Sequence, residues 1–363
     1  FLANHGSDVH VCNVKSAAAS CPPCSRHLLE TRLVQRFLSL VIVVCWLISA
    51  QAGFAAEPFE LKNGDRVVML GGTFIEREGN HGYIETALTT AWPDRKIAFR
   101  NLGWSGDTVW ADSRGNFDPP AEGYQRMLAL VSELKPTVIF LAYGANESFA
   151  GEPGLAPFVK QFEKLCDDLK PTNARLVFVT PPPFEKPQPP LPDVSRHNEN
   201  MRKYVAAVRE LSMRRNGRLV DLFAHVGVRT EIIASNPPQP SRAPLTADGV
   251  TPTPSGYFDL AQLIARELHL PTPNDPQRGF AGLARDPQSW TSTAPKSPMT
   301  LAEQLRLKIV AKNLLFFHRW RPQNITYLTG FRKHEQGNNA VEIAQFDPLV
   351  EKAEQEIAEL LKP

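Results

Sequence analysis

A hydroxyl side chain follows a glycine pair in the stretch 66–78, Arg-Val-Val-Met-Leu-Gly-Gly-Thr-Phe-Ile-Glu-Arg-Glu. Residues 67–70 form a short continuous apolar run, which is typical of a strand buried on both faces of a parallel sheet. Gly71 and Gly72 favour a sharp turn, which brings Thr73 out at the carboxyl end of that strand. Open α/β sheets bind ligands there, and several enzyme families place a nucleophilic hydroxyl on such a turn. The alternative is a tight turn that leads into a helix cap.

Three further groups of glycine, amide and hydroxyl residues follow later apolar runs. Each residue type is an ordinary turn former, but their order brings polar groups to one edge of the sheet. The Asn146 amide is a neutral donor suited to an oxyanion, and the Gly106 N–H can approach a ligand closely. The groups are Asn-Leu-Gly-Trp-Ser-Gly-Asp-Thr at 101–108, Tyr-Gly-Ala-Asn-Glu at 143–147, and Asp-Gly-Val-Thr-Pro-Thr-Pro-Ser-Gly-Tyr at 248–257, which starts at Asp248 and includes Thr251.

Strand-like and helix-like stretches alternate between residues 67 and 270, which indicates βαβ units with helices on both faces of a parallel sheet. We predict an α/β fold, a three-layer α/β/α sandwich around a mainly parallel five-stranded sheet, followed by a helical C-terminal extension. Prolines at 181–183 and 187–192 predict a stiff loop that forms one wall of a cleft. The predicted strands are 67–70, 97–102, 138–143, 176–180 and 218–222, and the predicted helices are 83–92, 124–134, 157–169, 198–215 and 255–268.

The four groups together resemble the motif blocks of the SGNH, or GDSL-type, hydrolase superfamily over about residues 62–270. Those blocks are Gly-Asp-Ser after the first strand, a glycine after the second, Gly-x-Asn-Asp after the third, and Asp-x-x-His before the last helix. Here they read Gly-Gly-Thr, Ser-Gly-Asp, Gly-Ala-Asn-Glu and Asp-Gly-Val-Thr. The resemblance implies a flavodoxin-like SGNH fold and an esterase, in which serine attacks the ester carbonyl. A histidine, oriented by the aspartate, accepts the serine proton.

Carried over residue by residue, the resemblance implies that Gly106 and Asn146 are oxyanion donors and that Asp248 is the orienting acid. Two positions depart from the superfamily pattern: Thr73 replaces the serine and Thr251 replaces the histidine. A threonine nucleophile needs an adjacent base, and a second threonine cannot accept a proton at pH 7. A triad without one member typically retains roughly 10³–10⁴-fold acceleration over water.

The sequence leaves two hypotheses open. In the first, the protein is an esterase for a small ester or an acylated carbohydrate, with a relocated base at His81, His197, Glu76 or Glu147. Solvation or capping is the commoner role of such carboxylates. In the second, the scaffold is catalytically inactive and binds a glycan or a protein partner through the same donors.

Residues 1–56 carry the pattern of an upstream segment and a signal peptide. Arg32 and Arg36 flank an apolar run at 37–50, and Ala-Gln-Ala at 50–52 fits a cleavage site. We therefore expect an exported protein, periplasmic or extracellular. The run is shorter than a spanning helix, so contact with a membrane is expected only if the signal stays uncleaved.

The exported part has a balanced charge. Residues 1–56 hold four of the 40 Lys and Arg and two of the 38 Asp and Glu, so 36 of each sign remain. This balance argues against nucleic acid as a partner. Of five cysteines only Cys166 remains, in a pattern typical of a core thiol. No His, Cys or carboxylate cluster has metal-ligand spacing, and we expect neither a metal nor a cofactor. The sequence makes no prediction of the oligomeric state.

The C-terminal part differs in composition from the rest. We divide the chain into 1–56, a hydrolase-like domain at 57–270, a linker or surface wrap at 271–299, and a helical extension at 300–363. Helical patterns occupy 301–317 and 350–361. Between them, aromatics mixed with Arg and amides are typical of a sugar- or partner-binding surface. The alternative is that four of these aromatics anchor the tail on the core: Phe316, Trp320, Tyr327 and Phe331.

Overall fold

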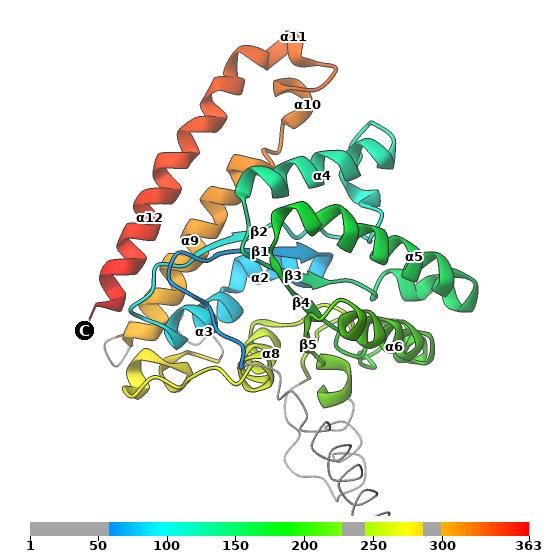
Figure 1. Ribbon diagram of the computed structural model, residues 1–363, viewed down its shortest axis with the longest axis horizontal. Helices are drawn as coiled ribbons and strands as arrows, with labels where there is room; N and C mark the ends of the chain where they lie inside the picture. The colour runs from blue at the N-terminus through cyan, green and yellow to red at the C-terminus, as the bar shows by residue number, and fades with distance from the viewer. Residues whose placement is uncertain (1–57, 227–243, 286–298, 363) are drawn as a thin grey trace, which may run out of the picture. The chain divides into compact units, whose positions relative to one another are not determined.

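The computed structural model describes residues 58–226, 244–285 and 299–362 (Figure 1). Residues 58–363 form one compact unit by their internal contacts. The signal segment lies outside the described residues, so export stays a prediction. Five strands form a single sheet in the order β2-β1-β3-β4-β5, and every pair is parallel. The strands are β1 (Arg66–Gly71), β2 (Ala98–Asn101), β3 (Val138–Ala142), β4 (Arg175–Val179) and β5 (Arg218–Val220).

Successive side chains of β1 enter two separate cores, one on each face of the sheet. Val67 and Met69 belong to one apolar cluster, and Val68 and Leu70 belong to the other. Both faces are buried, so the strand sequence is continuously apolar rather than alternating. The first face is covered by α3 (Tyr83–Ala91) and α8 (Pro254–Glu267), and the second by α4 (Pro120–Leu134), α5 (Gly151–Leu169) and α6 (Asn198–Arg214). The predicted three-layer α/β/α fold with a parallel sheet is confirmed.

The first helix starts earlier than its apolar pattern predicts. The chain forms α2 (Thr73–His81) directly after β1, and Gly82 then breaks it from α3. Gly82 has φ +69°, a left-handed conformation that ends helices and that residues with a Cβ adopt at a cost. Likewise α5 begins at Gly151 rather than at 157, and Pro157 lies inside it.

The C-terminal extension packs on the β2 edge of the sheet. It consists of α9 (Leu301–Trp320), the short helices α10 (Ile325–Leu328) and α11 (Lys333–Gln336), and α12 (Phe346–Leu361), which runs beside α9 (Figure 1). The buried Lys312 of α9 lies 2.5 Å from a Glu85 carboxylate oxygen and 3.3 Å from the Phe99 carbonyl oxygen of β2. A helix on this edge prevents another strand from pairing with it. The two predicted tail helices are confirmed.

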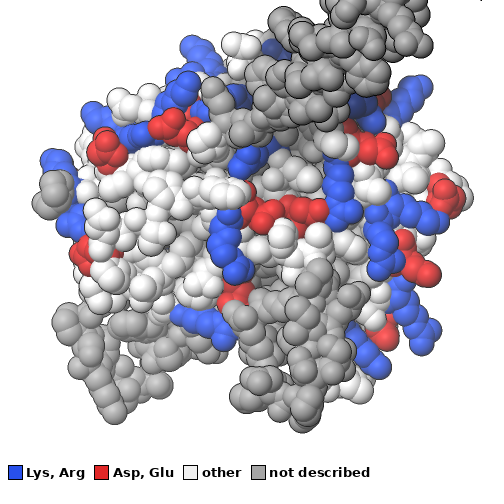
Figure 2. Space-filling model, turned by 60° about the horizontal axis from the view of Figure 1, so that its bottom comes forward, with Lys and Arg blue, Asp and Glu red and all other residues white. Residues whose placement is uncertain are grey.

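The stretch before α9 lies against the core as well. Leu283 is buried, and the Tyr83 hydroxyl donates a hydrogen bond to the Ala284 carbonyl oxygen at 2.6 Å. The boundaries that we place at 270 and 299 stay a prediction. In the described part of the chain, no helix is long and apolar enough to cross a membrane. Lys and Arg lie among Asp and Glu on the face that Figure 2 shows.

Candidate active site

Thr73 is the first residue of α2, at the carboxyl end of β1. The first N–H groups of a helix have no partner within the helix and carry a partial positive charge, which favours negative charge at this position. The loop after β2 presses against this turn, because a Cβ on Gly103 would come within 2.1 Å of the Glu76 backbone nitrogen. Glycine at 103 therefore lets the second motif reach the nucleophile position.

The backbone of Gly106 meets the Thr73 hydroxyl directly. The Gly106 N–H donates a hydrogen bond to Thr73 Oγ1 at 3.2 Å. Gly106 has φ +77°, a conformation that a glycine adopts without strain. The loop is also fixed to the strand, since the Trp104 N–H donates to the Gly71 carbonyl oxygen at 3.0 Å. The Gly106 N–H thus faces the Thr73 hydroxyl, and its role as an oxyanion donor stays a prediction.

Asn146 brings the third motif to the same place. Its side-chain Nδ2 donates to the Asp107 carbonyl oxygen at 2.8 Å, and a Cβ on Gly72 would lie 3.2 Å from that nitrogen. A small cavity of about 60 Å³ lies at this point. Thr73, Asn146 and Thr251 line it together with the backbone turn at Gly72, and the predicted proline wall is confirmed by Pro181, Pro182 and Phe184.

The fourth motif contributes Thr251 to the cavity, whereas Asp248 stabilises the turn behind it. One Asp248 oxygen, Oδ1, accepts the N–H groups of Val250 at 2.9 Å and Thr251 at 2.6 Å. Partial burial opposes ionisation of Asp248, but these hydrogen bonds lower its pKa below the usual value. The carboxylate therefore holds the backbone of Thr251.

The loop that carries Thr251 is fixed to the proline-rich loop by Glu185. The Glu185 carboxylate accepts the N–H groups of Leu245 at 3.1 Å and Thr246 at 2.8 Å, and also the Thr246 hydroxyl. The Glu185 N–H in turn donates to the Gly249 carbonyl oxygen at 2.9 Å. No sequence motif marks Glu185, because its partners lie about 60 positions away.

Glu147 lines the cavity, but its carboxylate is buried and occupied by backbone donors. One oxygen accepts the Val109 N–H at 2.9 Å and the other accepts the Gly144 N–H at 2.8 Å. Burial raises its pKa to about 7, against the lowering effect of these hydrogen bonds. Glu147 thus connects the second and third motif loops, and it does not stand free beside Thr73 as a base would.

The other candidate bases also have structural partners. Burial would raise the pKa of Glu76, but hydrogen bonds from Ser105 and Arg321 outweigh it and lower that pKa. The Glu76 oxygens accept the Ser105 N–H at 2.8 Å and the Ser105 hydroxyl at 2.7 Å. The half-buried His81 stacks on Tyr257, and burial lowers its pKa to about 4. His197 packs against an aromatic ring, Phe149. The lining of the Thr73 cavity, within the described residues, includes no histidine.

Cys166 is a buried core thiol, as its sequence pattern predicts, and burial raises its pKa to about 12. Over residues 58–226, 244–285 and 299–362, no three His, Cys, Asp or Glu side chains come together as ligands for a metal.

Residues 67–257, more than half of the chain, match the GDSL-like lipase/acylhydrolase family. The chain belongs to this family. The resemblance of its motifs to SGNH hydrolases is therefore confirmed, and the four motif segments are those that meet around Thr73. No curated protein matches the chain.

Several solved structures are similar to parts of this chain. A gut microbial diltiazem-metabolizing enzyme is 22% identical with a TM-score of 0.45; the match covers 58% of this chain and 48% of that enzyme, so the chain spans about half of its length. A catalytic mutant of an acetylxylan esterase from Geobacillus stearothermophilus is 20% identical with a TM-score of 0.45, over 58% of this chain and 96% of the esterase. Another variant of that esterase is 19% identical with a TM-score of 0.46, and the match covers 60% of this chain and 100% of the variant.

Proposed function

We propose that the protein is a slow esterase that removes short acyl groups, with Thr73 as the nucleophile. The observation that carries this proposal is the 3.2 Å hydrogen bond from the Gly106 N–H to Thr73 Oγ1, in contact with a cavity that Asn146 also lines. These groups are the oxyanion donors that GDSL-like hydrolysis needs. A carbonyl oxygen placed there would meet neutral donors at the positive end of α2.

The size of the cavity favours a small acyl group. Its volume is about 60 Å³, and on the same measure one water molecule needs roughly 10–15 Å³. An acetyl group fits such a space, whereas a long acyl chain would extend beyond it. The alcohol part of the ester would lie outside it, which suits either a small ester or an acylated carbohydrate. An exported protein, periplasmic or extracellular, would meet such acylated carbohydrates outside the cell.

The reaction would take two steps. Thr73 Oγ1 forms a bond to the acyl carbon while the bond from that carbon to the alcohol oxygen breaks, and the alcohol leaves with a proton. Water then attacks the acyl-threonine, releases the carboxylic acid and regenerates the hydroxyl. Gly106 and Asn146 stabilise the oxyanion in both steps.

The rate should be modest because the usual proton acceptor is replaced by Thr251. Without a histidine, solvent water takes the Thr73 proton, and catalysis rests on the Thr73 hydroxyl and the oxyanion donors. A site that has lost one member of its triad is expected to accelerate the reaction roughly 10³–10⁴-fold over the uncatalysed rate.

A second candidate function is binding of an acyl group without turnover. It is favoured by the same replacement of histidine by Thr251, and by the use of the Asp248 carboxylate on backbone N–H groups. Under this candidate, the donors around Thr73 hold a carbonyl or carboxylate oxygen, and no bond breaks.

Hydrolysis of p-nitrophenyl acetate by the full-length protein distinguishes the two. We expect slow turnover that falls by about 100-fold or more in Asn146→Ala, the usual effect of losing an oxyanion donor. Thr73→Ala removes the attacking oxygen and should reduce hydrolysis to the background rate. Thr172→Ala serves as the matched control, since Thr172 caps a turn between α5 and β4. Equal activity in the wild type and both site variants would exclude Thr73 as the nucleophile and leave binding as the function.

A further inference from the structure

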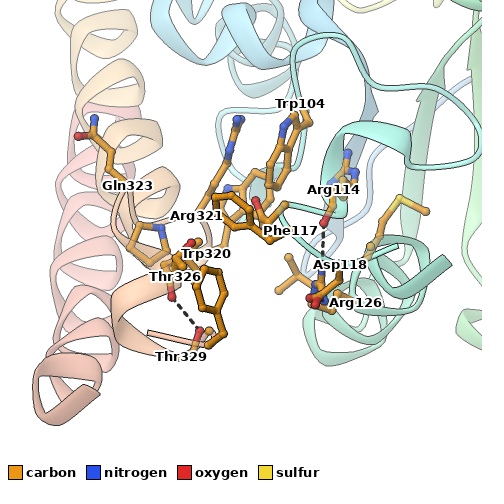
Figure 3. Close-up of a pocket in the computed structure, with 18 of the residues that line it drawn as sticks. Trp104, Arg114, Phe117, Asp118, Arg126, Trp320, Arg321, Gln323, Thr326 and Thr329 are labelled. Atoms are coloured by element: carbon orange, nitrogen blue, oxygen red, sulfur yellow. Dashed lines mark hydrogen bonds and ion pairs between the residues drawn. The ribbon is translucent and has the colours of Figure 1, made fainter. Parts of the chain in front are cut away.

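A second and larger cavity, of about 740 Å³, lies between the loop after β2, helix α4 and the C-terminal segment (Figure 3). Ligand pockets typically measure roughly 300–1,000 Å³, so this volume suits a ligand much larger than an acyl group. We call it the composite cavity because the domain and the extension each supply one wall. Its lining includes Trp104, Arg114, Phe117, Trp320, Arg321 and Phe331.

The composite cavity lacks unpaired positive charge in its described lining. Each of its three guanidinium groups is already paired with a carboxylate, so an anionic ligand would meet little net positive charge. A guanidinium nevertheless has five N–H donors, more than one carboxylate uses, and can hydrogen-bond to a neutral ligand as well. The pairs are Arg114 with Asp107 at 2.6 Å, Arg126 with Asp118 at 2.8 Å, and Arg321 with Glu76.

Two phenylalanines of the lining are unusually exposed. Phe117 is 75% exposed and Phe331 is 68% exposed, and their rings meet edge to face with centroids 5.4 Å apart. Large apolar side chains that gather on a surface mark binding sites. The ring of Phe331, which we predict to anchor the tail on the core, is mostly exposed and contacts the domain through Phe117. Phe316, in contrast, is buried as predicted.

Two tryptophans lie deeper in the composite cavity. The rings of Trp104 and Trp320 meet at 5.7 Å, and the Arg321 guanidinium stacks over Trp104 at 3.6 Å from its ring centre (Figure 3). Polar side chains of Asn116 and Gln323 complete the rim. The lining therefore combines flat aromatic surfaces with neutral hydrogen-bonding groups.

We propose that the composite cavity binds a short neutral oligosaccharide. A sugar ring has an apolar C–H face that stacks on an aromatic ring, and hydroxyl groups at its edge that pair with amides and guanidinium donors. A purely apolar ligand would satisfy only the rings, and an anion would compete with the three carboxylates. This binding does not depend on hydrolysis at Thr73.

The composite cavity and the Thr73 cavity share one loop. Trp104 lines the former, and Gly106 of the same loop donates its hydrogen bond to Thr73. Glu76 joins them further, because it accepts hydrogen bonds from Ser105 and from Arg321. A sugar chain in the composite cavity therefore lies beside the loop that carries the oxyanion donor.

The proposal is tested by calorimetric titration of the full-length protein with xylohexaose, cellohexaose and mannohexaose at millimolar concentration. Trigalacturonic acid is the anionic comparison. We expect at least one neutral chain to bind and to change the tryptophan fluorescence, since Trp104 and Trp320 line the cavity. Phe117→Ala and Phe331→Ala should each weaken binding about tenfold or more. Phe149→Ala, at a 49% exposed phenylalanine outside this lining, should not.

Because both phenylalanines are exposed, their replacement should leave the urea midpoint unchanged. Absence of binding by all three neutral chains would overturn the proposal, as would tighter binding of trigalacturonic acid. Unaltered affinity in both Phe→Ala variants would overturn it as well. Binding that persists in Thr73→Ala separates this site from the esterase, so failure of one proposal remains distinct from failure of the other.

Discussion

Replacing Thr251 by histidine would return a proton acceptor to the wall of the Thr73 cavity. Asp248 already stands three positions before it, and its carboxylate, whose Oδ1 accepts the Val250 and Thr251 N–H groups, would orient the imidazole in addition. In the background of Thr73→Ser, we expect Thr251→His to raise kcat for p-nitrophenyl acetate by about 10²–10⁴-fold, the usual contribution of general base catalysis. The pH profile of the double variant should gain an inflection near the ordinary histidine pKa.

The single variant Thr73→Ser is the matched control for this gain. It should change kcat only slightly, because a serine without a base has the same difficulty as a threonine. Removing Asp248 from the restored triad, as Asp248→Asn, should abolish most of the gain. A double variant no faster than the wild type would show that position 251 does not face the reacting hydroxyl.

Among individual residues, the sequence predicts the motif residues near Thr73 better than the carboxylates that hold their loops in place. The positions of Gly106 and Asn146 near Thr73 were predictable, because glycine and asparagine follow successive strands in the order of the four motif groups. The roles of Glu147 and Glu185 were not, since a carboxylate that accepts backbone N–H groups has no motif of its own. Arg321 reaches Glu76 from 245 positions away, and only the folded chain brings them together.

At the scale of elements, the buried pair between Lys312 of α9 and Glu85 of α3 should be essential for docking the extension. Lys312→Ala leaves the Glu85 carboxylate buried without its partner, which typically reduces the free energy of unfolding by about 3–5 kcal/mol. Lys308→Ala, in the same helix, breaks an exposed pair with Glu356 and should reduce it by about 0–1 kcal/mol. Urea denaturation of both variants measures the difference. A loss no larger for Lys312→Ala than for Lys308→Ala would contradict this role.

The five strands and most helices were predictable. Strands buried on both faces are continuous apolar runs, and helices buried on one face have apolar residues about every 3.6 positions. Element starts were less predictable. The pattern places the first helix at 83, but α2 forms from a polar stretch, Thr73–His81, because its N-terminus turns directly out of β1. The docking of α9 on the β2 edge depends on buried Lys and Glu side chains, which a sequence pattern assigns to the solvent.

For the molecule as a whole, two buried carboxyl groups should make the protein less stable as pH rises from about 6.5 to 8.5. Burial raises the pKa of Glu78 to about 8 and that of Glu147 to about 7. The folded state therefore binds these protons more tightly than the unfolded state. The stabilisation is fully present below the ordinary Glu pKa and is lost as pH passes through 7 and 8. His81 acts in the opposite direction, but only below about pH 6.5, where its depressed pKa favours the unfolded state.

Glu78→Gln tests this prediction, because it keeps an oxygen acceptor for the Ile84 N–H and removes the ionisation. We expect the wild type to lose roughly 2 kcal/mol of unfolding free energy through Glu78 between pH 6.5 and 8.5. The variant should lose correspondingly less, whereas Glu122→Gln, at an exposed position of α4, should keep the wild-type slope. The measurement is urea unfolding at several pH values. Glu78 lies in α2, so its ionisation would also weaken the helix that begins with Thr73, the nucleophile that we propose. A wild-type slope of zero or of opposite sign would mean that water or rearrangement relieves the buried charge.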